Sequence, residues 1–258
     1  MKTSFSPLYA SAYDLLNEGK PYKEEIEFVQ TLFTRYAEIE KLTSVLDLGC
    51  GSGKHLSIFP SSILKTGVDI SDSMLEIAAD RDIPNTQFFS SNIGDFRSNT
   101  KFSLIYSLFH VMSYQTTETE LISAFKTMRD HLSHDGLAVF DFWHRPPWDI
   151  DPPITRITTK ENSSLTVKRI SSPVFDRLSG MVSIDMDIFV NDSKARESKY
   201  SHFSERHVMR AYTLQELEFA AKLGGMQIVG SGPWMNTNRK LSASDWYGWA
   251  ALRPFTQK

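Results

Sequence analysis

Residues 45–53, with the sequence Val-Leu-Asp-Leu-Gly-Cys-Gly-Ser-Gly, constrain the fold of this chain more than any other segment. A short apolar run, interrupted by Asp47, leads directly into three alternating glycines, Gly49, Gly51 and Gly53. A buried strand that runs into a glycine-rich turn lets backbone amides approach a ligand closely, because no Cβ stands in the way. The segment therefore predicts a strand whose carboxyl end meets a small ligand.

The spacing of the glycines excludes two common phosphate-binding loops. A dinucleotide-binding turn requires G-x-G-x-x-G, but Lys54 stands where the third glycine would be. A P-loop requires G-x-x-x-x-G-K-[ST], whereas Lys54 is followed by His55, and Leu48 stands where the first glycine would be. The pattern that remains is D-x-G-x-G-x-G.

A second acid, Asp69, follows the glycines at the spacing of a ribose-binding acid. Residues 64–70 predict a strand ending near Asp69, about 20 residues beyond the glycines, where βαβ nucleotide-binding folds carry an acid for the ribose. A carboxylate can accept hydrogen bonds from both ribose hydroxyls, and charge-assisted bonds are the stronger kind. Taken singly, Asp47 could be a turn cap and Asp69 a solvated strand end. Together with the glycines, the two acids favour a bound nucleoside.

Length and charge narrow the class of protein. The 258 residues fit one α/β domain with an elaboration. A net charge of −3 provides no general attraction to nucleic acid or anionic membranes. The single cysteine, Cys50, forms no internal disulfide and is read as a small residue of the turn. Residues 1–7 lack an apolar leader, and no run of about 18 apolar residues occurs. We therefore expect a cytoplasmic protein with neither nucleic acid nor membrane as a partner.

Hydrophobic periodicity predicts alternating strands and helices, and hence a mostly parallel sheet. Expected strands cover 45–48, 64–69, 86–90, 102–107, 137–142, 226–230 and 246–252, and expected helices cover 9–16, 22–39, 55–59, 74–79, 117–132 and 213–223. Ser71 is expected to cap one helix, and Thr213 with Glu216 forms a capping box for another.

The segment after Trp143 changes character. Two Pro-Pro pairs, at 146–147 and 152–153, interrupt any regular element, and residues 181–190 alternate between apolar and polar. Antiparallel strands inserted into the domain account for this pattern. We expect residues 1–143 and 211–258 to form the core with an N-terminal helical lid. Residues 144–210 would then be an inserted β subdomain that binds substrate, forms a homodimer, or both.

The D-x-G-x-G-x-G pattern and this order of parts resemble the class I S-adenosylmethionine (SAM) dependent methyltransferases. Three more segments are similar to the N-methyltransferases of nucleotide-linked amino-deoxysugars. They are the lid at 9–22 (YASAYDLLNEGKPY), residues 140–143 (FDFW) and residues 202–207 (HFSERH). The chain departs from that family at Asn92, where many relatives carry Asp, so that Asp95 is an alternative contact for adenine. Residues 231–249 also look longer than in those relatives.

The resemblance implies a Rossmann-like, seven-stranded α/β fold, SAM as cofactor and a sugar nucleotide as substrate. The cofactor contacts that it implies are Tyr13, Tyr22, Asp47, Gly49, Cys50, Gly51, Gly53, Asp69, Ile70, Met74, Asn92, Ile93, Ser107 and Leu108. The implied substrate contacts are Phe109, Tyr114, Trp143 and Arg206.

Methyl transfer to an amine is an in-line displacement, for which alignment alone can supply roughly 7–11 kcal/mol. The amine must be neutral to attack, so a proton acceptor is needed nearby. Candidates are His207, favoured by the resemblance, His110, which follows a strand at its ligand-binding end, and Tyr13. The rings of Tyr13 and Tyr22 could also face the sulfonium in a cation–π contact.

Other classes of protein fit less well. His131 and His134 form a His-x-x-His pair, which we read as compensation of a helix dipole on a solvated surface, so no metal is expected. No G-x-S-x-G elbow occurs. A methyltransferase for another small molecule and a non-catalytic SAM-binding protein stay open, as does, more distantly, a Rossmann oxidoreductase.

Overall fold

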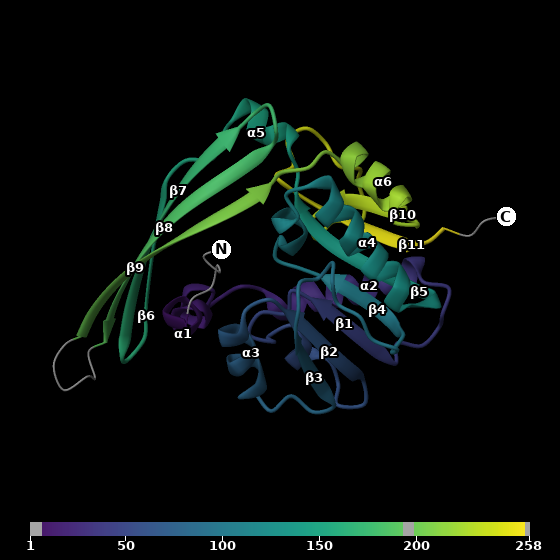
Figure 1. Ribbon diagram of the computed structural model, residues 1–258, viewed down its shortest axis with the longest axis horizontal. Helices are drawn as coiled ribbons and strands as arrows, with labels where there is room; N and C mark the ends of the chain where they lie inside the picture. The colour runs from purple at the N-terminus through teal and green to yellow at the C-terminus, as the bar shows by residue number, and fades with distance from the viewer. Residues whose placement is uncertain (1–6, 193–198, 256–258) are drawn as a thin grey trace.

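In the computed structural model the chain forms two separate sheets, a central one covered by helices and a long antiparallel one that extends away from it (Figure 1). The structure describes residues 7–192 and 199–255. The strand orders are β10-β11-β5-β4-β1-β2-β3 in the central sheet and β6-β7-β8-β9 in the other.

The central sheet is mostly parallel, as the sequence predicts. Its strands are β1 (Ser44–Leu48), β2 (Leu64–Asp69), β3 (Thr86–Ser90), β4 (Phe102–Ser107), β5 (Leu132–Trp143), β10 (Met226–Pro233) and β11 (Tyr247–Pro254). The first five pair in parallel, and β11 runs antiparallel to both β5 and β10. All five residues of β1 are buried, because a parallel strand is covered on both faces. The carboxyl ends of β1, β2, β4 and β5 therefore meet at one edge.

Helices cover both faces of this sheet. They are α2 (Tyr22–Tyr36), α3 (Asp72–Ala79), α4 (Glu118–His131) and α6 (Leu214–Leu223), with 3₁₀ turns η1 (Leu56–Ile58) and η2 (Val111–Tyr114). Residues of α4 and α6 share one core cluster with the sheet, and residues of α2 share the other. The Ser71 cap and the capping box at Thr213 are confirmed.

Two expected helices are shorter than predicted. The helix expected at 55–59 is only a single 3₁₀ turn, since Phe59 is extended before Pro60, as a residue preceding proline prefers. The helix expected to reach Ile39 ends at Tyr36, where Ala37 turns to an extended conformation.

The predicted antiparallel insertion lies between β5 and α6. After the short helix α5 (Pro146–Ile150) come β6 (Arg156–Glu161), β7 (Leu165–Asp176), β8 (Met181–Asp192) and β9 (Lys199–Arg210), each antiparallel to its neighbour. Helix α1 (Pro7–Leu16) lies between this sheet and the central domain (Figure 1). Tyr9, Ala12 and Leu15 of α1 form an apolar cluster with Val167 and Ile188 of the inserted sheet.

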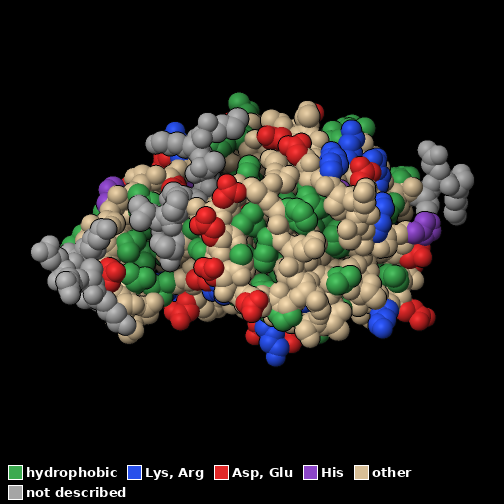
Figure 2. Space-filling view, turned by 60° about the horizontal axis from the view of Figure 1, so that its bottom comes forward, with side chains coloured by type: hydrophobic (Ala, Val, Ile, Leu, Met, Phe, Trp, Pro, Cys, Tyr) green, Lys and Arg blue, Asp and Glu red, His purple; other side chains and the backbone are tan. Residues whose placement is uncertain are grey.

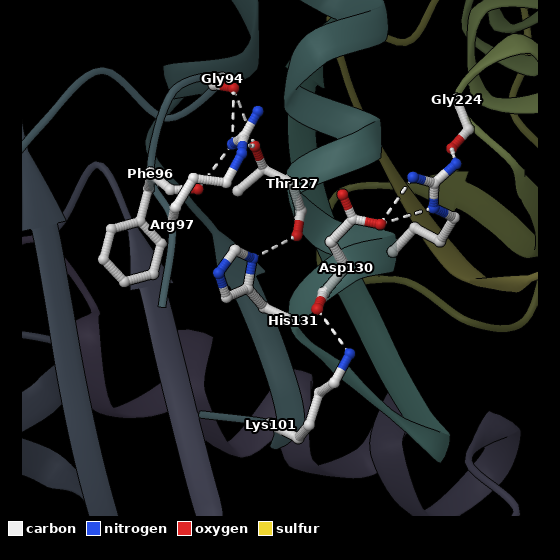
Figure 3. Close-up of polar contacts among 9 residues, drawn as sticks. Gly94, Phe96, Arg97, Lys101, Thr127, Asp130, His131 and Gly224 are labelled. Atoms are coloured by element: carbon white, nitrogen blue, oxygen red, sulfur yellow. Dashed lines mark hydrogen bonds and ion pairs between the residues drawn. The ribbon is translucent and has the colours of Figure 1, made fainter. Parts of the chain in front are cut away.

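The end of α4 is tied to the loop that follows β3 (Figure 3). His131 is 1% exposed; its Nδ1 donates to the Thr127 carbonyl at 2.8 Å, and its Nε2 accepts the Ser98 N–H at 2.9 Å. Arg97 donates to the Gly94 carbonyl at 3.1 Å. The expectation of a solvated His131 is therefore wrong, because tertiary contacts bury the side chain at the helix end. These bonds fix the loop that carries residues 91–98.

The distribution of charged side chains on the surface is consistent with the modest net charge. Figure 2 shows a face on which acidic and basic side chains are scattered among apolar ones. In the described part of the chain, no helix is long and apolar enough to span a membrane.

Candidate active site

A cavity of about 560 Å³ lies where the carboxyl ends of the central strands meet α1 and the inserted sheet. That volume suits a small-molecule site. The core and α1 line it with Tyr9, Tyr13, Asn17, Gly49, Gly51, Asp69, Ile70, Met74, Ser91, Asn92, Ile93, Leu108, Phe109, His110, Val111, Tyr114, Gln115 and Trp143. The inserted sheet contributes Arg169, Ile184, Met186, His207 and Met209.

The glycine turn forms one wall of this cavity. Gly49, Gly51 and Gly53 all have positive φ angles, of 86°, 51° and 74°. A Cβ on Gly49 would lie 2.5 Å from the side chain of Val111, so glycine is required there by backbone conformation and by packing. The turn thus presents bare backbone to the cavity.

Asp69 is held by the same turn. Its Oδ2 accepts the Gly51 N–H at 2.8 Å, and its Oδ1 accepts the Ser71 N–H at 2.9 Å. Burial raises the pKa of this carboxyl, although the backbone hydrogen bonds oppose the shift. A carboxylate fixed in this way keeps lone pairs for a ligand hydroxyl, which is the role expected of an acid at the end of β2.

A smaller hollow continues the cavity beneath Tyr13 and Phe109, bordered by Tyr22 and His55. The Tyr22 hydroxyl is buried and has no hydrogen-bond partner in the part of the chain that the structure describes. The Lys20 ammonium lies 4.5 Å from the centroid of the Tyr22 ring and 4.6 Å from that of Phe109. An unsatisfied hydroxyl beside a glycine cradle is suited to the polar tail of a ligand.

At the opposite side of the cavity, Tyr114, His207 and Glu205 form a polar chain. The Tyr114 hydroxyl lies 2.8 Å from Nδ1 of His207, and Nε2 of His207 lies 3.3 Å from Oε2 of Glu205. His207 is 1% exposed. Burial raises the pKa of the Tyr114 hydroxyl, so this group stays protonated. Such a chain can pass a proton from the cavity to an imidazole that a carboxylate stabilises.

His110 enters the cavity from a strained turn. Phe109 and His110 both adopt left-handed backbone conformations, with φ of 68° and 64°. Asp141, 2% exposed at the end of β5, accepts the His110 N–H at 2.8 Å and lies 3.1 Å from its Nδ1. The ring of His110 stacks on Tyr247 at a centroid distance of 4.9 Å. Asp141 therefore both holds the turn and orients the imidazole.

The sequence and the fold resemble those of known methyltransferases. The sequence model of a family described as a methyltransferase domain matches residues 45–136. A dTDP-3-amino-3,4,6-trideoxy-alpha-D-glucopyranose N,N-dimethyltransferase of Streptomyces venezuelae is 27% identical over 223 residues, which are 85% of this chain and 90% of the relative.

Solved structures extend the similarity over nearly the whole chain. DesVI of Streptomyces venezuelae superposes with a TM-score of 0.79 at 25% identity, covering 96% of this chain and 98% of DesVI. SAM-bound CalS10, an amino pentose methyltransferase of Micromonospora echinaspora, superposes with a TM-score of 0.74 at 21% identity, covering 98% and 99%. The chain is a class I SAM-dependent methyltransferase. SAM is its cofactor.

The cavity of the methyltransferase gathers most of the residues expected from its sequence. Of the expected cofactor contacts, Tyr13, Gly49, Gly51, Asp69, Ile70, Met74, Asn92, Ile93 and Leu108 line the large cavity, and Tyr22 and Cys50 line the hollow beside it. The large cavity is also lined by the expected substrate contacts Phe109, Tyr114 and Trp143. The candidate proton acceptors His110 and His207 line it too. Asn92 Oδ1 accepts the Gly94 N–H at 2.8 Å, whereas Asp95 is exposed and does not line the cavity.

Three expected cofactor contacts lie behind the cavity wall. Asp47 is buried beneath the glycine turn, where desolvation raises the pKa of its carboxyl well above the usual value. Gly53 faces the core, since a Cβ there would lie 3.2 Å from Ala78. The Ser107 hydroxyl donates to the Leu48 carbonyl at 2.7 Å and so ties β4 to β1. All three support the turn from behind.

The expected substrate contact of Arg206 is wrong. Side chains alternate across a strand, so Arg206 points away from the cavity that its neighbour His207 lines. Arg206 instead forms a bidentate ion pair with Asp185 on the outer face. Its Nε donates to Oδ1 at 2.6 Å, and its Nη2 donates to Oδ2 at 2.8 Å. The two-residue repeat of β9 thus places His207 of the 202–207 motif in the cavity wall and Arg206 outside it.

Sequence reasoning missed the cavity residues of the methyltransferase that come from α1 and β7–β9. They are Tyr9, Arg169, Ile184, Met186 and Met209, and the loops and the 3₁₀ turn η2 add Asn17, Ser91, Val111 and Gln115, which were also missed. A usable signal existed for the inserted sheet. Once His207 is assigned to the cavity, alternation assigns Met209 to the same face, and the register of β9 with β8 then brings in Ile184.

Proposed function

We propose that this methyltransferase transfers the methyl group of SAM to the amine of a nucleotide-linked amino-deoxysugar. The observation that carries the proposal is the shared cavity, which runs from Asp69 at the glycine turn to the Tyr114–His207 pair at the inserted sheet. The similarity to an amino-sugar nucleotide N,N-dimethyltransferase over 85% of the chain supports the class of acceptor.

In this proposal the two parts of the chain divide the work. Residues 1–143 and 211–258 bind the cofactor, with α1 as a lid, and residues 144–210 bind the acceptor. Support comes from the cavity lining, because the glycine turn belongs to the first part and His207 to the second.

The residues present fit SAM. Asp69 would accept the ribose hydroxyls, the bare backbone at Gly49 and Gly51 would lie against the cofactor, and the unsatisfied Tyr22 hydroxyl would meet its polar tail. The ring of Tyr13 offers an aromatic face for a cation–π contact with a sulfonium. When bound, SAM supplies an electrophilic methyl group for in-line transfer.

The protein's own chemical task is to remove a proton from the acceptor. An amine attacks only when neutral, so an ammonium must lose a proton to the Tyr114 oxygen while the Tyr114 hydroxyl proton passes to Nδ1 of His207. Glu205, 3.3 Å from Nε2, stabilises the resulting imidazolium. General-base assistance of this kind contributes about 10²- to 10⁴-fold in rate.

Two other groups remain candidates for the proton acceptor. His110 is oriented by Asp141, as a base within a catalytic dyad would be. Burial raises the pKa of the Tyr13 hydroxyl, which suits Tyr13 as a neutral hydrogen-bonding partner better than as a base.

A methylation screen tests the proposal. The purified protein is incubated with SAM and separate acceptors: dTDP-linked amino-deoxysugars, the matching hydroxysugar nucleotides, and free amino acids. Mass spectrometry should detect one or two added methyl groups only on the amino-sugar nucleotides. Transfer only to another acceptor would refute the sugar assignment, and SAM binding with no transfer to any acceptor would indicate a non-catalytic protein.

A further inference from the structure

The inserted sheet contributes one permanent cation to the cavity wall. Among the described lining residues, Arg169 is the only lysine or arginine. It lies on β7 on the same face as Val167, which packs against α1, so its side chain is directed toward the cavity rather than toward solvent.

The guanidinium of Arg169 is poorly satisfied. Its Nη1 donates to the Tyr9 hydroxyl at 3.3 Å, and its Nε is buried without a hydrogen-bond partner in residues 7–192 and 199–255. No described Asp or Glu pairs with it, whereas Arg81, Arg206 and Arg210 each pair with a carboxylate. A partly buried charge without a counter-charge is unfavourable, and an anionic ligand would neutralise it.

We propose that Arg169 binds a phosphate oxygen of the acceptor and thereby directs the acceptor's amine toward Tyr114. This inference rests on the proposed function, since it assigns the anionic part of that same acceptor. A guanidinium presents a planar fork of donors that matches phosphate oxygens, and such charge-assisted bonds are strong and directional.

The other charges of the cavity agree with this orientation. Asp69, the one carboxylate among the described lining residues, belongs to the glycine turn and would repel a phosphate from that side. Arg169 belongs to the inserted sheet, and the Tyr9 hydroxyl that it contacts also lies 4.0 Å from Sδ of Met186. An acceptor with its phosphate at Arg169 and its amine at Tyr114 therefore avoids the negative charge of Asp69.

The anion at Arg169 belongs to the acceptor rather than to the cofactor. Ring contacts lead from Tyr9 to Tyr13, with centroids 6.0 Å apart, and from Tyr13 to Phe109, 6.4 Å apart, at the mouth of the smaller hollow. Arg169 contacts the Tyr9 hydroxyl, at the end of this series of rings that is farther from the smaller hollow. The cofactor carboxylate would lie at the other end, near Tyr22 and Lys20.

Binding measurements without catalysis test the inference. Isothermal titration calorimetry in saturating S-adenosylhomocysteine compares dTDP, thymidine and inorganic pyrophosphate as probes, for the wild type and for Arg169→Gln. We expect dTDP to bind the wild type more tightly than thymidine, and Arg169→Gln to weaken dTDP about 10- to 100-fold without affecting thymidine. Equal binding of dTDP to both proteins would overturn the inference.

Two variants separate recognition from a structural role. Lys168→Gln removes a charge from the exposed position next to Arg169 and should leave dTDP binding unchanged. Arg169→Lys, which keeps the charge but not the fork, should recover part of the affinity. Arg169→Lys that binds dTDP no better than Arg169→Gln, with both variants less stable than the wild type in urea unfolding, would indicate a packing role and would overturn the inference.

The experiment also distinguishes this inference from the proposed function. A parallel loss of S-adenosylhomocysteine affinity in Arg169→Gln would assign the side chain to the cofactor and overturn the inference. Amino-sugar nucleotides methylated with the same KM by wild type and Arg169→Gln would refute the role of Arg169 and leave the function intact. Arg169-dependent dTDP binding without methylation of any amino-sugar nucleotide would refute the function and leave the phosphate site.

Discussion

Replacing Asp69 by asparagine tests the cofactor side of the cavity with almost no change of shape. The carboxylate accepts two backbone N–H groups, from Gly51 at 2.8 Å and Ser71 at 2.9 Å. An amide has only one acceptor oxygen, so in Asp69→Asn an NH₂ group faces one of these donors or the ribose. The variant therefore loses charge and acceptor capacity at the point where the sugar of SAM is expected.

The size of the effect follows from the chemistry of that bond. Hydrogen bonds to charged groups contribute about 1.5–3 kcal/mol, which corresponds to a rise of about 12- to 140-fold in the dissociation constant of SAM. Isothermal titration calorimetry with SAM and S-adenosylhomocysteine measures it directly. Asp72→Asn is the matched control, since Asp72 is an exposed acid three positions along, at the start of α3.

The pH dependence provides an independent check on the same residue. Burial raises the pKa of Asp69 above its ordinary value of 3.8, and a protonated carboxyl loses an acceptor. Wild-type affinity for S-adenosylhomocysteine should therefore fall as the pH is lowered, starting above pH 3.8, whereas Asp69→Asn should bind with a flatter profile. Equal affinities of the two proteins at neutral pH, with the same pH profile, would refute the assignment of Asp69 to the ribose.

Other perturbations address the remaining parts of the structure. His207→Asn should lower kcat about 10²- to 10⁴-fold with unchanged SAM affinity; equal turnover would remove His207 from the mechanism. Glu25→Gln removes the buried carboxylate that pairs with half-buried Lys20 and should cost about 3–5 kcal/mol in urea unfolding, against no change for exposed Glu24→Gln. Burial raises the Glu25 pKa, but its histidine and lysine partners outweigh that and lower it, so the stabilisation should be present above pH 4.5 and lost below it. Gly49→Ala should cost about 2–4 kcal/mol through its left-handed backbone and its clash with Val111, and adding Val111→Ala should restore part of that stability.

Features encoded by neighbouring residues were predictable from the sequence. The glycine turn, the strand ending at Asp69 and the Thr213 capping box depend on short-range patterns, and all three appear at the expected positions. Alternation along 181–190 correctly predicted the antiparallel insertion. Local geometry and hydrophobic periodicity are sufficient for such elements.

Features that depend on distant contacts were not predictable in the same way. His131 looks like a surface residue of a helix end, but the loop around Ser98 covers it. The contribution of Tyr9 and Arg169 to the cavity depends on how α1 and the inserted sheet pack together, which no local pattern specifies. The exclusion of Arg206 from the cavity, by contrast, was predictable from the sequence. The two-residue repeat of a strand directs its side chain to the face opposite that of His207.

The separation of the two sheets has a consequence for protein engineering. The backbones of strands β6–β9 pair only with one another within the described residues, so cavity-facing side chains on them can be varied without altering the ladder of strands that carries the glycine turn. Ile184, Met186 and Met209 face the cavity from this sheet. A combinatorial library at these three positions should shift which acceptors are methylated while the affinity for SAM stays constant, so that the two properties can be selected one at a time.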